Sequence, residues 1–315
     1  RPVLVDYIDS TVGGGQYIDT GFVCRQGDDV DLRFDLLSVD PADYAEDPDV
    51  FCVFGLRYKS ETFLEVGHCL PKPTTTGMFF DYEQCTVSTL SRLSSFSPDI
   101  DSFVVHGDGT LMQITNPNGE TVSQTVASPA AFSAEVTAYL FHSHLVEYTN
   151  AKWRPHPRMR FRTLLIRRGN EDHWFLPART PEGKPCVYDV WERRLLQNKG
   201  TGADFVLGPD CASQGTQVTV NLSGAGTLRV NGEPCGTSLT TNLTIGESIE
   251  LSVLPSAGNA FLRWTSNVDL YDGDTLPAMR LAANPVQGDI SLTAEVGPGI
   301  TALEYIDSTK GGGQY

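Results

Sequence analysis

Short alternations of hydrophobic and polar residues run through this chain and predict β-strands. Residues 30–37 read VDLRFDLL, and similar runs follow over 102–105, 110–115, 136–142 and 158–166. Successive side chains of a strand point to opposite faces, so each run offers one apolar face to a core. Clusters of Gly, Pro, Asn and Asp separate the runs, as in sandwiches and barrels of many short strands. We therefore expect an all-β fold with little helix.

The end of the chain repeats its beginning. Residues 5–17 read VDYIDSTVGGGQY and residues 303–315 read LEYIDSTKGGGQY, with ten of the thirteen positions identical and an offset of 298 residues. This offset is far longer than the roughly 20–50 residues of a solenoid repeat. We expect one full unit of a tandem array followed by the start of the next, with one or two domains in each unit.

The repeated segment predicts a joint between units. It is rich in β-forming residues followed by three glycines. It either closes the sheet of its own unit or docks on the edge of the preceding unit as an added strand. The residues expected to form this inter-repeat joint are Tyr7, Ile8, Tyr17, Leu303, Tyr305, Ile306 and Tyr315.

Motifs at both ends of the first two thirds of the chain carry a family resemblance. The chain opens YIDSTVGGGQYIDTGF, and residues 160–209 hold FLPAR, a YD pair and NKGTGADF. An FGLR motif lies between them at 54–57. Together these motifs resemble the concanavalin A-like (laminin-G-like) jelly-roll modules of large bacterial surface proteins. The resemblance implies an antiparallel jelly-roll sandwich over residues 1–210.

A second resemblance follows over residues 215–296. The motifs VNG at 230–232, GESI at 246–249, PSAGNAFLRW at 255–264 and GDISLTA at 288–294 resemble a divergent bacterial B-repeat of the internalin-associated kind. The resemblance implies a second, smaller β domain over 211–297 that acts as a spacer. Residues 298–315 then form a linker and the first strand of the next repeat.

Composition narrows the classes of partner and location. The 315 residues carry a formal net charge of −16, which argues against nucleic acid because a phosphate backbone requires a basic surface. No apolar run approaches the roughly 18 residues of a membrane helix, so we expect no membrane insertion in this segment. With the resemblance to bacterial surface proteins, we expect an extracellular or cell-surface location.

The seven cysteines include one pair that strand geometry brings together. No Cys-x-x-Cys motif is present, so a zinc site has little support. Two strand-like runs flank Ser60-Glu61, and a two-residue loop there places Cys52 opposite Cys69 at a non-hydrogen-bonded position, where Cα atoms lie closest. We expect a Cys52–Cys69 disulfide, with two buried thiols as the alternative.

The chain lacks the catalytic motifs found on this type of fold. Retaining glycosidases carry Glu-x-Asp-x-x-Glu on one strand, which sets two carboxylates about 5–5.5 Å apart. That spacing does not occur, nor does a nucleophile elbow or a P-loop. His142 and His144 share one face of an expected strand without a third metal ligand. We expect no catalytic residues and no enzyme.

Three groups of residues are candidates for binding. Asp269, Asp272 and Asp274 surround one turn, which is part of a calcium loop, with a plain acidic turn as the alternative. Trp153 and Trp191 are candidates for stacking on a glycan. No other cofactor is expected.

An arginine face is the third group. Arg158, Arg160 and Arg162 alternate with Met159 and Phe161. They form either a solvated sheet face or a basic patch that meets an acidic surface such as residues 40–49.

Two functions fit these observations. The first is a structural repeat unit of a large extracellular fibre or cell-surface stalk, with neighbouring copies of the repeat as partners. The alternative is an adhesin that binds surface glycans or proteins through a lectin-like edge, with avidity supplied by the array. Fold alone does not choose between them.

Overall fold

The computed structural model of the chain is nearly all β, which confirms the expected fold class. It describes residues 1–11, 15–25, 27–37, 50–58, 61–72, 75–82, 101–107, 110–115, 119, 121–125, 136–146, 153–155, 158–169, 171–283 and 285–299. The chain divides into unit 1, Arg1–Gln214, and unit 2, which begins at Gly215.

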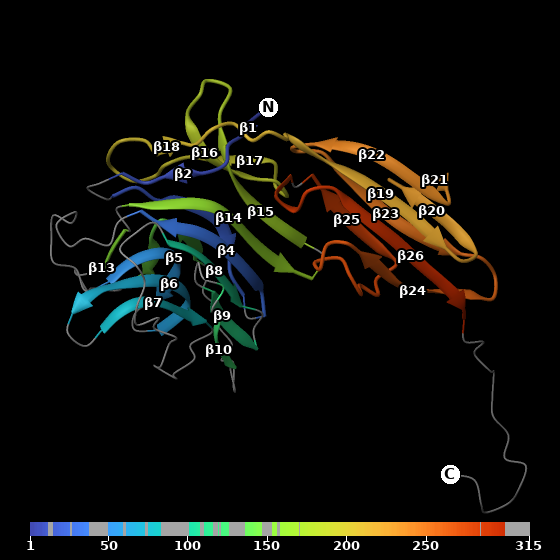
Figure 1. Cartoon of the computed structure of the whole chain (residues 1–315), viewed down its shortest axis with the longest axis horizontal. Coiled ribbons are helices and arrows are strands. Elements are labelled where there is room, and N and C mark those ends of the chain that lie inside the picture. The colour runs from blue at the N-terminus through green and yellow to red at the C-terminus, as the bar shows by residue number, and fades with distance from the viewer. Residues whose placement is uncertain are drawn as a thin grey trace, which may run out of the picture. The chain divides into compact units, whose positions relative to one another are not determined.

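Unit 1 is a sandwich of two largely antiparallel sheets (Figure 1). Its strands are β1 (Val3–Leu4), β2 (Ile8–Asp9), β3 (Ile18–Val23), β4 (Asp29–Leu36), β5 (Val50–Tyr58), β6 (Glu61–Lys72), β7 (Thr75–Tyr82), β8 (Asp101–Gly107), β9 (Leu111–Thr115), β10 (Thr121–Thr125), β11 (Thr137–Leu140), β12 (Ser143–Val146), β13 (Trp153–Pro155), β14 (Met159–Arg168), β15 (Glu171–Arg179), β16 (Pro185–Asp189), β17 (Arg194–Leu196) and β18 (Val206–Leu207).

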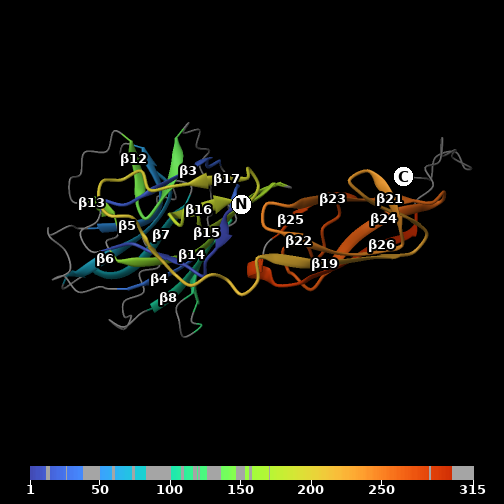
Figure 2. The ribbon, with the colours of Figure 1, turned by 90° about the horizontal axis from the view of Figure 1, so that it is seen from above.

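The larger sheet has eleven strands and contains the candidate functional site. Its main path is β10-β9-β8-β4-β14-β15-β16-β17, with β1 on β15 and with β2 between β14 and β18. Figure 2 shows β14 and β4 side by side. The smaller sheet of seven strands follows the order β3-β11-β5-β6-β7, and β12 and β13 pair in parallel with β5. Strands expected from the alternating pattern are present as β4, β8, β9, β11 and β14.

One apolar core lies between the two sheets. Phe34 and Phe161 come from the larger sheet and Phe54 from the smaller one, and all three are fully buried. Phe141, between β11 and β12, reaches across to Phe161 at a ring-centroid distance of 6.2 Å. The alternation of β14 explains this arrangement, because Met159 and Phe161 point inward and the intervening arginines point outward. The sandwich is compatible with a jelly roll.

The hairpin of β5 and β6 is present, but its expected register was wrong. Tyr58 pairs with Glu61, so the loop begins one residue earlier than the expected Ser60-Glu61. Two bulges in the ladder compensate each other, and Cys52 pairs with Gly67 while Cys69 pairs with Val50. The two cysteines are therefore not cross-strand partners, and the geometric argument for a Cys52–Cys69 disulfide fails. When the loop shifts by one residue, each residue of β5 pairs two positions away from its expected partner on β6, so the expected partner of every residue changes.

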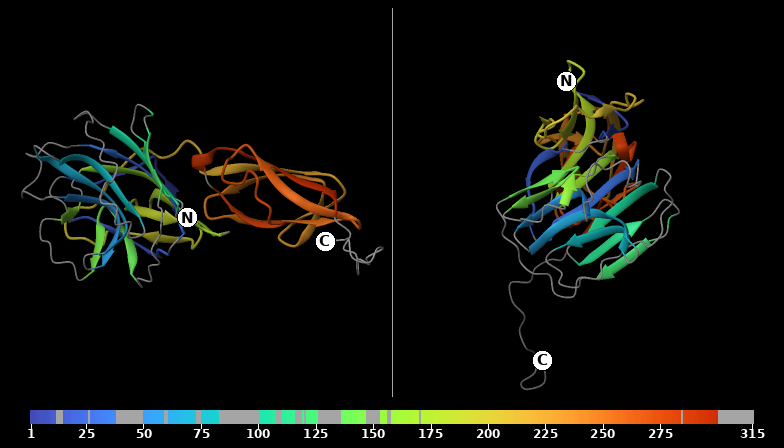
Figure 3. Two further views of the ribbon diagram at one scale, coloured as in Figure 1. Left: turned by 90° about the horizontal axis from the view of Figure 1, so that it is seen from below. Right: turned by 90° about the vertical axis from the view of Figure 1, so that its left-hand side faces the viewer.

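Unit 2 is a smaller sandwich of two four-stranded sheets. Its strands are β19 (Gly215–Ser223), β20 (Gly226–Val230), β21 (Glu233–Gly236), β22 (Ser238–Thr244), β23 (Ser248–Pro255), β24 (Asn259–Ser266), β25 (Ala278–Ala282) and β26 (Ile290–Pro298), with the 3-10 helix η2 at Pro285–Gln287. The sheet orders are β22-β19-β26-β24 and β21-β20-β23-β25. Figure 3 shows these strands in orange and red.

The core of unit 2 is centred on Trp264, whose side chain is fully buried. Its indole Nε1–H donates to the carbonyl of Leu276 at 2.9 Å, which satisfies the one polar atom of the ring. The first and last strands of this unit, β19 and β26, are neighbours and run parallel from Val218↔Ile290 to Ser223↔Glu295. Among the described residues of the chain, no helix is long and apolar enough to cross a membrane.

Candidate functional site: the dock of the opening segment

The repeated sequence at the start of the chain forms part of the large sheet of unit 1. We call residues 5–17 the opening segment, of which 12–14 lie outside the described residues. Its strand β2 pairs on one side with Arg160 and Phe161 of β14, and on the other with Val206 and Leu207 of β18. Ile8 is fully buried in the shared core. We call residues 159–161, 198–203 and 206–208 the dock, because they receive this segment.

Tyr7 is held by two features of the dock. The guanidinium carbon Cζ of Arg160 lies 3.4 Å from the centroid of its ring, in a cation–π contact. Gly208 approaches the same ring so closely that a Cβ added there would lie 2.9 Å from it. The Gly208 N–H also donates to the Tyr7 carbonyl at 2.9 Å. Glycine at 208 therefore makes room for the tyrosine ring.

Asp9 and Ser10 complete the contacts of the strand. Asp9 accepts a bidentate pair from Arg160, with Nε–Oδ1 at 2.8 Å and Nη2–Oδ2 at 2.9 Å. The hydrogen bond that Arg160 donates to Asp9 raises the pKa of Arg160 above its usual value. The Ser10 hydroxyl accepts from the Met159 N–H at 2.8 Å and donates to the Met159 carbonyl at 3.3 Å. One arginine thus binds both Tyr7 and Asp9, and so couples two residues of the repeated motif.

The loop half of the opening segment is bound through Gln16. Its side chain is almost fully buried, and its Nε2 donates to the carbonyl of Ala203 at 2.6 Å. Its Oε1 accepts from the Thr11 backbone N–H at 2.8 Å and the Thr11 hydroxyl at 3.2 Å, which folds the segment back on itself. Gly15 has a φ of 86°, and an added Cβ would lie 2.6 Å from the Thr201 carbonyl oxygen. A side chain at Gly15 would therefore be excluded by both its φ and this close approach.

Tyr17 closes the far end of the opening segment. Its N–H donates to the Asn198 Oδ1 at 3.3 Å, and its carbonyl accepts from the Lys199 N–H at 2.9 Å. Its ring stacks on Tyr139 of β11 at 4.7 Å between centroids. Tyr139 in turn stacks on His144 at 4.0 Å. Tyr17 therefore links the dock to the smaller sheet.

The same side chains recur at the other end of the chain. The described contacts from Tyr7 to Tyr17 involve Tyr, Ile, Asp, Ser, Thr, Gly, Gln and Tyr, and each has an identical counterpart 298 residues later. These counterparts are Tyr305, Ile306, Asp307, Ser308, Thr309, Gly313, Gln314 and Tyr315. Residues 300–315 lie outside the described residues, so the roles expected for Leu303, Tyr305, Ile306 and Tyr315 stay predictions.

Two residues of the arginine face pair with aspartates of neighbouring strands, whereas residues 40–49, the acidic surface considered from the sequence, lie outside the described residues. Arg160 binds Asp9 of β2, and Arg162 binds Asp35 of β4 with an Nη2–Oδ2 distance of 2.7 Å. Asp35 is one of several nearly buried aspartates whose charge an arginine of a neighbouring strand balances. The alternating pattern of β4 and β14 predicted that both would be strands. It did not predict that the two strands are antiparallel neighbours, because they lie far apart in the sequence, so the arginine–aspartate pairs could not be assigned from it.

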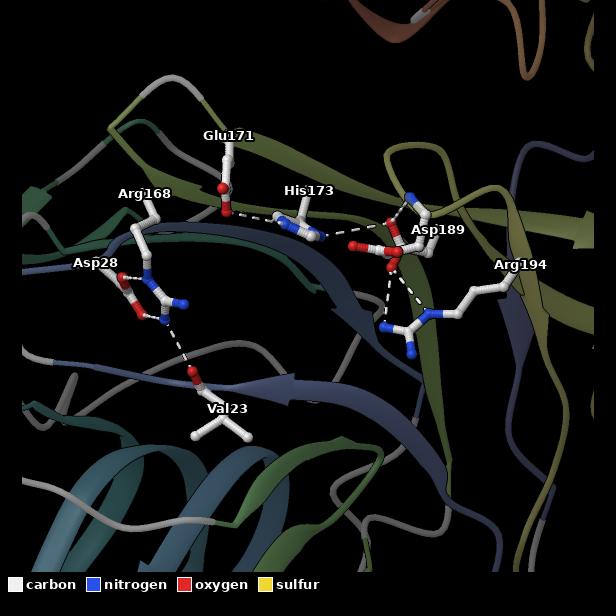
Figure 4. A network of polar contacts seen from close by, with 8 residues as sticks. Val23, Asp28, Arg168, Glu171, His173, Asp189 and Arg194 are labelled. Atoms are coloured by element: carbon white, nitrogen blue, oxygen red, sulfur yellow. Dashed lines mark hydrogen bonds and ion pairs between the residues drawn. The ribbon is translucent and has the colours of Figure 1, made fainter.

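Two more arginine pairs line the region drawn in Figure 4. Arg168 donates from Nε and Nη2 to Asp28 at 2.8 and 2.7 Å, and its Nη2 also donates to the Val23 carbonyl at 2.8 Å. The hydrogen bond to Asp28 raises the pKa of Arg168 above its usual value. Arg194 donates to the fully buried Asp189 at 3.1 and 3.0 Å. The Arg168–Asp28 pair links β14 to the residue just before β4, and the Arg194–Asp189 pair links β17 to β16.

The nearly buried His173 lies between two carboxylates in the same view. Its Nδ1 is 3.6 Å from the Asp189 Oδ1, and its Nε2 is 3.9 Å from the Glu171 Oε2. The Asp189 oxygens also accept from Arg194 and from the backbone N–H of Glu192 at 3.2 Å. The Asp189 carboxylate therefore stabilises the turn between β16 and β17. This favours a structural role for Asp189 over that of a catalytic base.

The other expected binding residues lie elsewhere. The Asp272 Oδ1 accepts from the Ser266 N–H at 2.9 Å, and the Asp274 Oδ1 accepts from the Leu276 N–H at 2.9 Å. Among the described residues, which include Asp269, no three His, Cys, Asp or Glu side chains gather as a metal site. The calcium loop at Asp269, Asp272 and Asp274 stays a prediction, and the two backbone contacts also fit the alternative of a plain acidic turn.

The two tryptophans proposed for glycan contact differ in what the structure describes. The backbone of Trp153 belongs to β13, and its side chain lies outside the described residues. The ring of Trp191 packs on His173 at 5.7 Å between centroids. Its stacking on a glycan stays a prediction.

Comparison with models of known protein families gave no match. Comparison with curated protein sequences gave none either. The resemblances noted from the sequence therefore rest on their motifs and on the sandwich architecture alone.

Proposed function

We propose that this chain is a structural repeat unit of a large extracellular fibre or cell-surface stalk. In this proposal, units follow one another in tandem, and each opening segment closes the large sheet of the unit that it begins. The observation that carries the proposal is the dock: the residues of the YIDST–GQY motif make specific contacts within unit 1, and the same residues recur 298 positions later.

The contacts of the opening segment favour one of the two joints considered from the sequence. The backbone of β2 is paired on both sides, with β14 and with β18. A strand that is paired on both sides has no free edge to offer a preceding unit. The repeated motif therefore serves its own unit in this proposal, and the unit can be copied along a chain without a new interface at each step.

The finer family assignment belongs to the same proposal. A concanavalin A-like sandwich followed by a B-repeat-like spacer is supported by the two sandwiches and by the motifs at both ends of unit 1. The adhesin alternative depends on an exposed aromatic surface. The packing of Trp191 on His173 does not favour it.

Electron microscopy of the native material tests this role. We expect long filaments with one 298-residue unit per axial repeat, which antibodies against unit 1 should decorate at that spacing. Isolated particles without an axial repeat would contradict the structural role, and a glycan-binding screen on the whole chain would then be the next experiment.

A further inference from the structure

Residues 303–315 repeat the motif that the dock binds at residues 5–17. We propose that the dock is a self-recognition site that also accepts residues 303–315 of a second copy of this chain. The exchange would replace the opening segment of one chain by the C-terminal copy of another. This inference goes beyond the proposed structural role, because it concerns association between chains and holds for the chain in isolation.

The described contacts of the dock with Tyr7–Thr11 and Gly15–Tyr17 do not distinguish the two copies, because these residues are identical in both. Arg160 binds Tyr7 through the cation–π contact at 3.4 Å and Asp9, two positions later, through the bidentate pair at 2.8 and 2.9 Å. Tyr305 and Asp307 have the same spacing. The Ala203 carbonyl accepts a hydrogen bond from the side-chain amide of Gln16, and Gln314 is the counterpart of Gln16 in the C-terminal copy. The differences in residues 5–17 are Val5, Asp6 and Val12, which Leu303, Glu304 and Lys310 replace.

Glycines admit either copy to the dock by the same close approach. The backbone at Gly200 lies so near the Gly15 carbonyl that no side chain fits between them, and Gly208 leaves room for the Tyr7 ring. Gly313 and Tyr305 are the corresponding residues of the C-terminal copy. The steric requirements of the dock are therefore met by both copies.

The resident copy has the advantage of its covalent attachment. A tethered segment acts at an effective concentration of the order of mM, so it outcompetes an identical segment in trans at ordinary protein concentrations. Exchange of an identical element between protomers is a known low-cost route to association. Weakening only the resident copy should therefore reveal binding of the second copy, since the dock itself is unchanged.

The experiment compares matched variants of the full chain. In the resident variant, Tyr7→Ala removes the ring that Arg160 contacts, and Asp9→Asn removes the charge and the bidentate pair with Arg160. In the C-terminal variant, Tyr305→Ala and Asp307→Asn make the same changes in the other copy. Analytical ultracentrifugation then gives the mass of each variant over a range of concentrations, and circular dichroism checks that each is folded. Ser10→Ala is a milder resident variant, since it removes only the hydroxyl contacts with Met159.

We expect the resident variant to associate into dimers or longer species at a concentration at least tenfold lower than the wild-type chain. Combining both pairs of substitutions should return it to a monomer. A labelled peptide of residues 303–315 should bind the resident variant at least tenfold more tightly than the wild-type chain, and should lose this binding when it carries the C-terminal substitutions. A resident variant that stays monomeric and binds no peptide would overturn the proposal. Association that persists with both pairs of substitutions would also overturn it.

Discussion

Gly200→Ala tests whether the opening segment is held by the close approach of two backbones. A methyl group at this position would lie much closer to the Gly15 carbonyl oxygen than 3.0 Å, the shortest approach that a Cβ atom tolerates. Both partners are backbone, so neither can swing aside as a flexible side chain would. Either the loop at 198–203 or the segment at 15–17 must move.

The cost follows from the hydrogen bonds that join these two stretches. They are the bond from Gln16 to the Ala203 carbonyl at 2.6 Å, the bond from the Tyr17 N–H to Asn198 at 3.3 Å, and the bond from Lys199 to the Tyr17 carbonyl at 2.9 Å. At about 1 kcal/mol net for each bond, their loss lowers the free energy of unfolding of unit 1 by about 3 kcal/mol.

Urea unfolding followed by tryptophan fluorescence measures this change in the full chain. Trp153, Trp174 and Trp191 report on unit 1 and Trp264 on unit 2, so the transition of unit 2 is an internal control. Gly183→Ala is the matched substitution. Its φ is 83° and an added Cβ meets nothing within 4 Å, so it should cost only about 1 kcal/mol of backbone strain. Equal losses for Gly200→Ala and Gly183→Ala would refute the reasoning.

Three further predictions concern other parts of the chain. Trp264→Phe should destabilise unit 2 by about 2–3 kcal/mol, because it removes the hydrogen bond to Leu276 and leaves a void. The substitution removes the tryptophan of unit 2, so circular dichroism follows the urea unfolding here, and an unchanged midpoint for that unit would contradict the prediction. Arg168→Ala should cost unit 1 about 3 kcal/mol, since the nearly buried carboxylate of Asp28 loses the positive charge that balances it. The double variant with Asp28→Asn should recover part of the loss, and a simple sum of the two single losses would count against the pairing. Burial raises the pKa of the Cys186 thiol from 9.0 to about 12. The unfolded chain loses this proton above about pH 9 while the folded unit keeps it, so stability is full below pH 9 and falls by up to about 1.4 kcal/mol per pH unit above it. Cys186→Ala should flatten this decline in urea midpoints measured from pH 8 to 10, and an identical slope in the variant would contradict the assignment.

The fold followed from periodicity, because period-two alternation is a local property of the sequence. The alternation over residues 30–37 and 158–166 found β4 and β14, and the inward positions were also correct, since Phe34 and Phe161 are fully buried. Register was harder to predict. The loop between β5 and β6 begins one residue early and two bulges follow, and periodicity carries no information about either feature.

The opening segment could be predicted from the sequence, but the dock residues that bind it were harder to predict. Self-similarity marked Tyr7, Ile8 and Tyr17, because repetition is visible without any structure. The role of Arg160 was not visible in this way. Its partner Asp9 lies 151 residues away, and a basic residue on a strand has many possible acidic partners until the pairing of β2 with β14 is known.

The parallel neighbours β19 and β26 have a mechanical consequence. They are the first and last strands of unit 2, and their ladder runs from Val218↔Ile290 to Ser223↔Glu295. A force applied at the two ends of this unit pulls these strands in opposite directions along their own axes. The load is then shared by all the bonds of the ladder in shear, and they must rupture together rather than open one by one as in a zipper. Unit 2 should therefore resist stretching far better than its thermodynamic stability alone would suggest, since forced unfolding is governed by the unfolding rate.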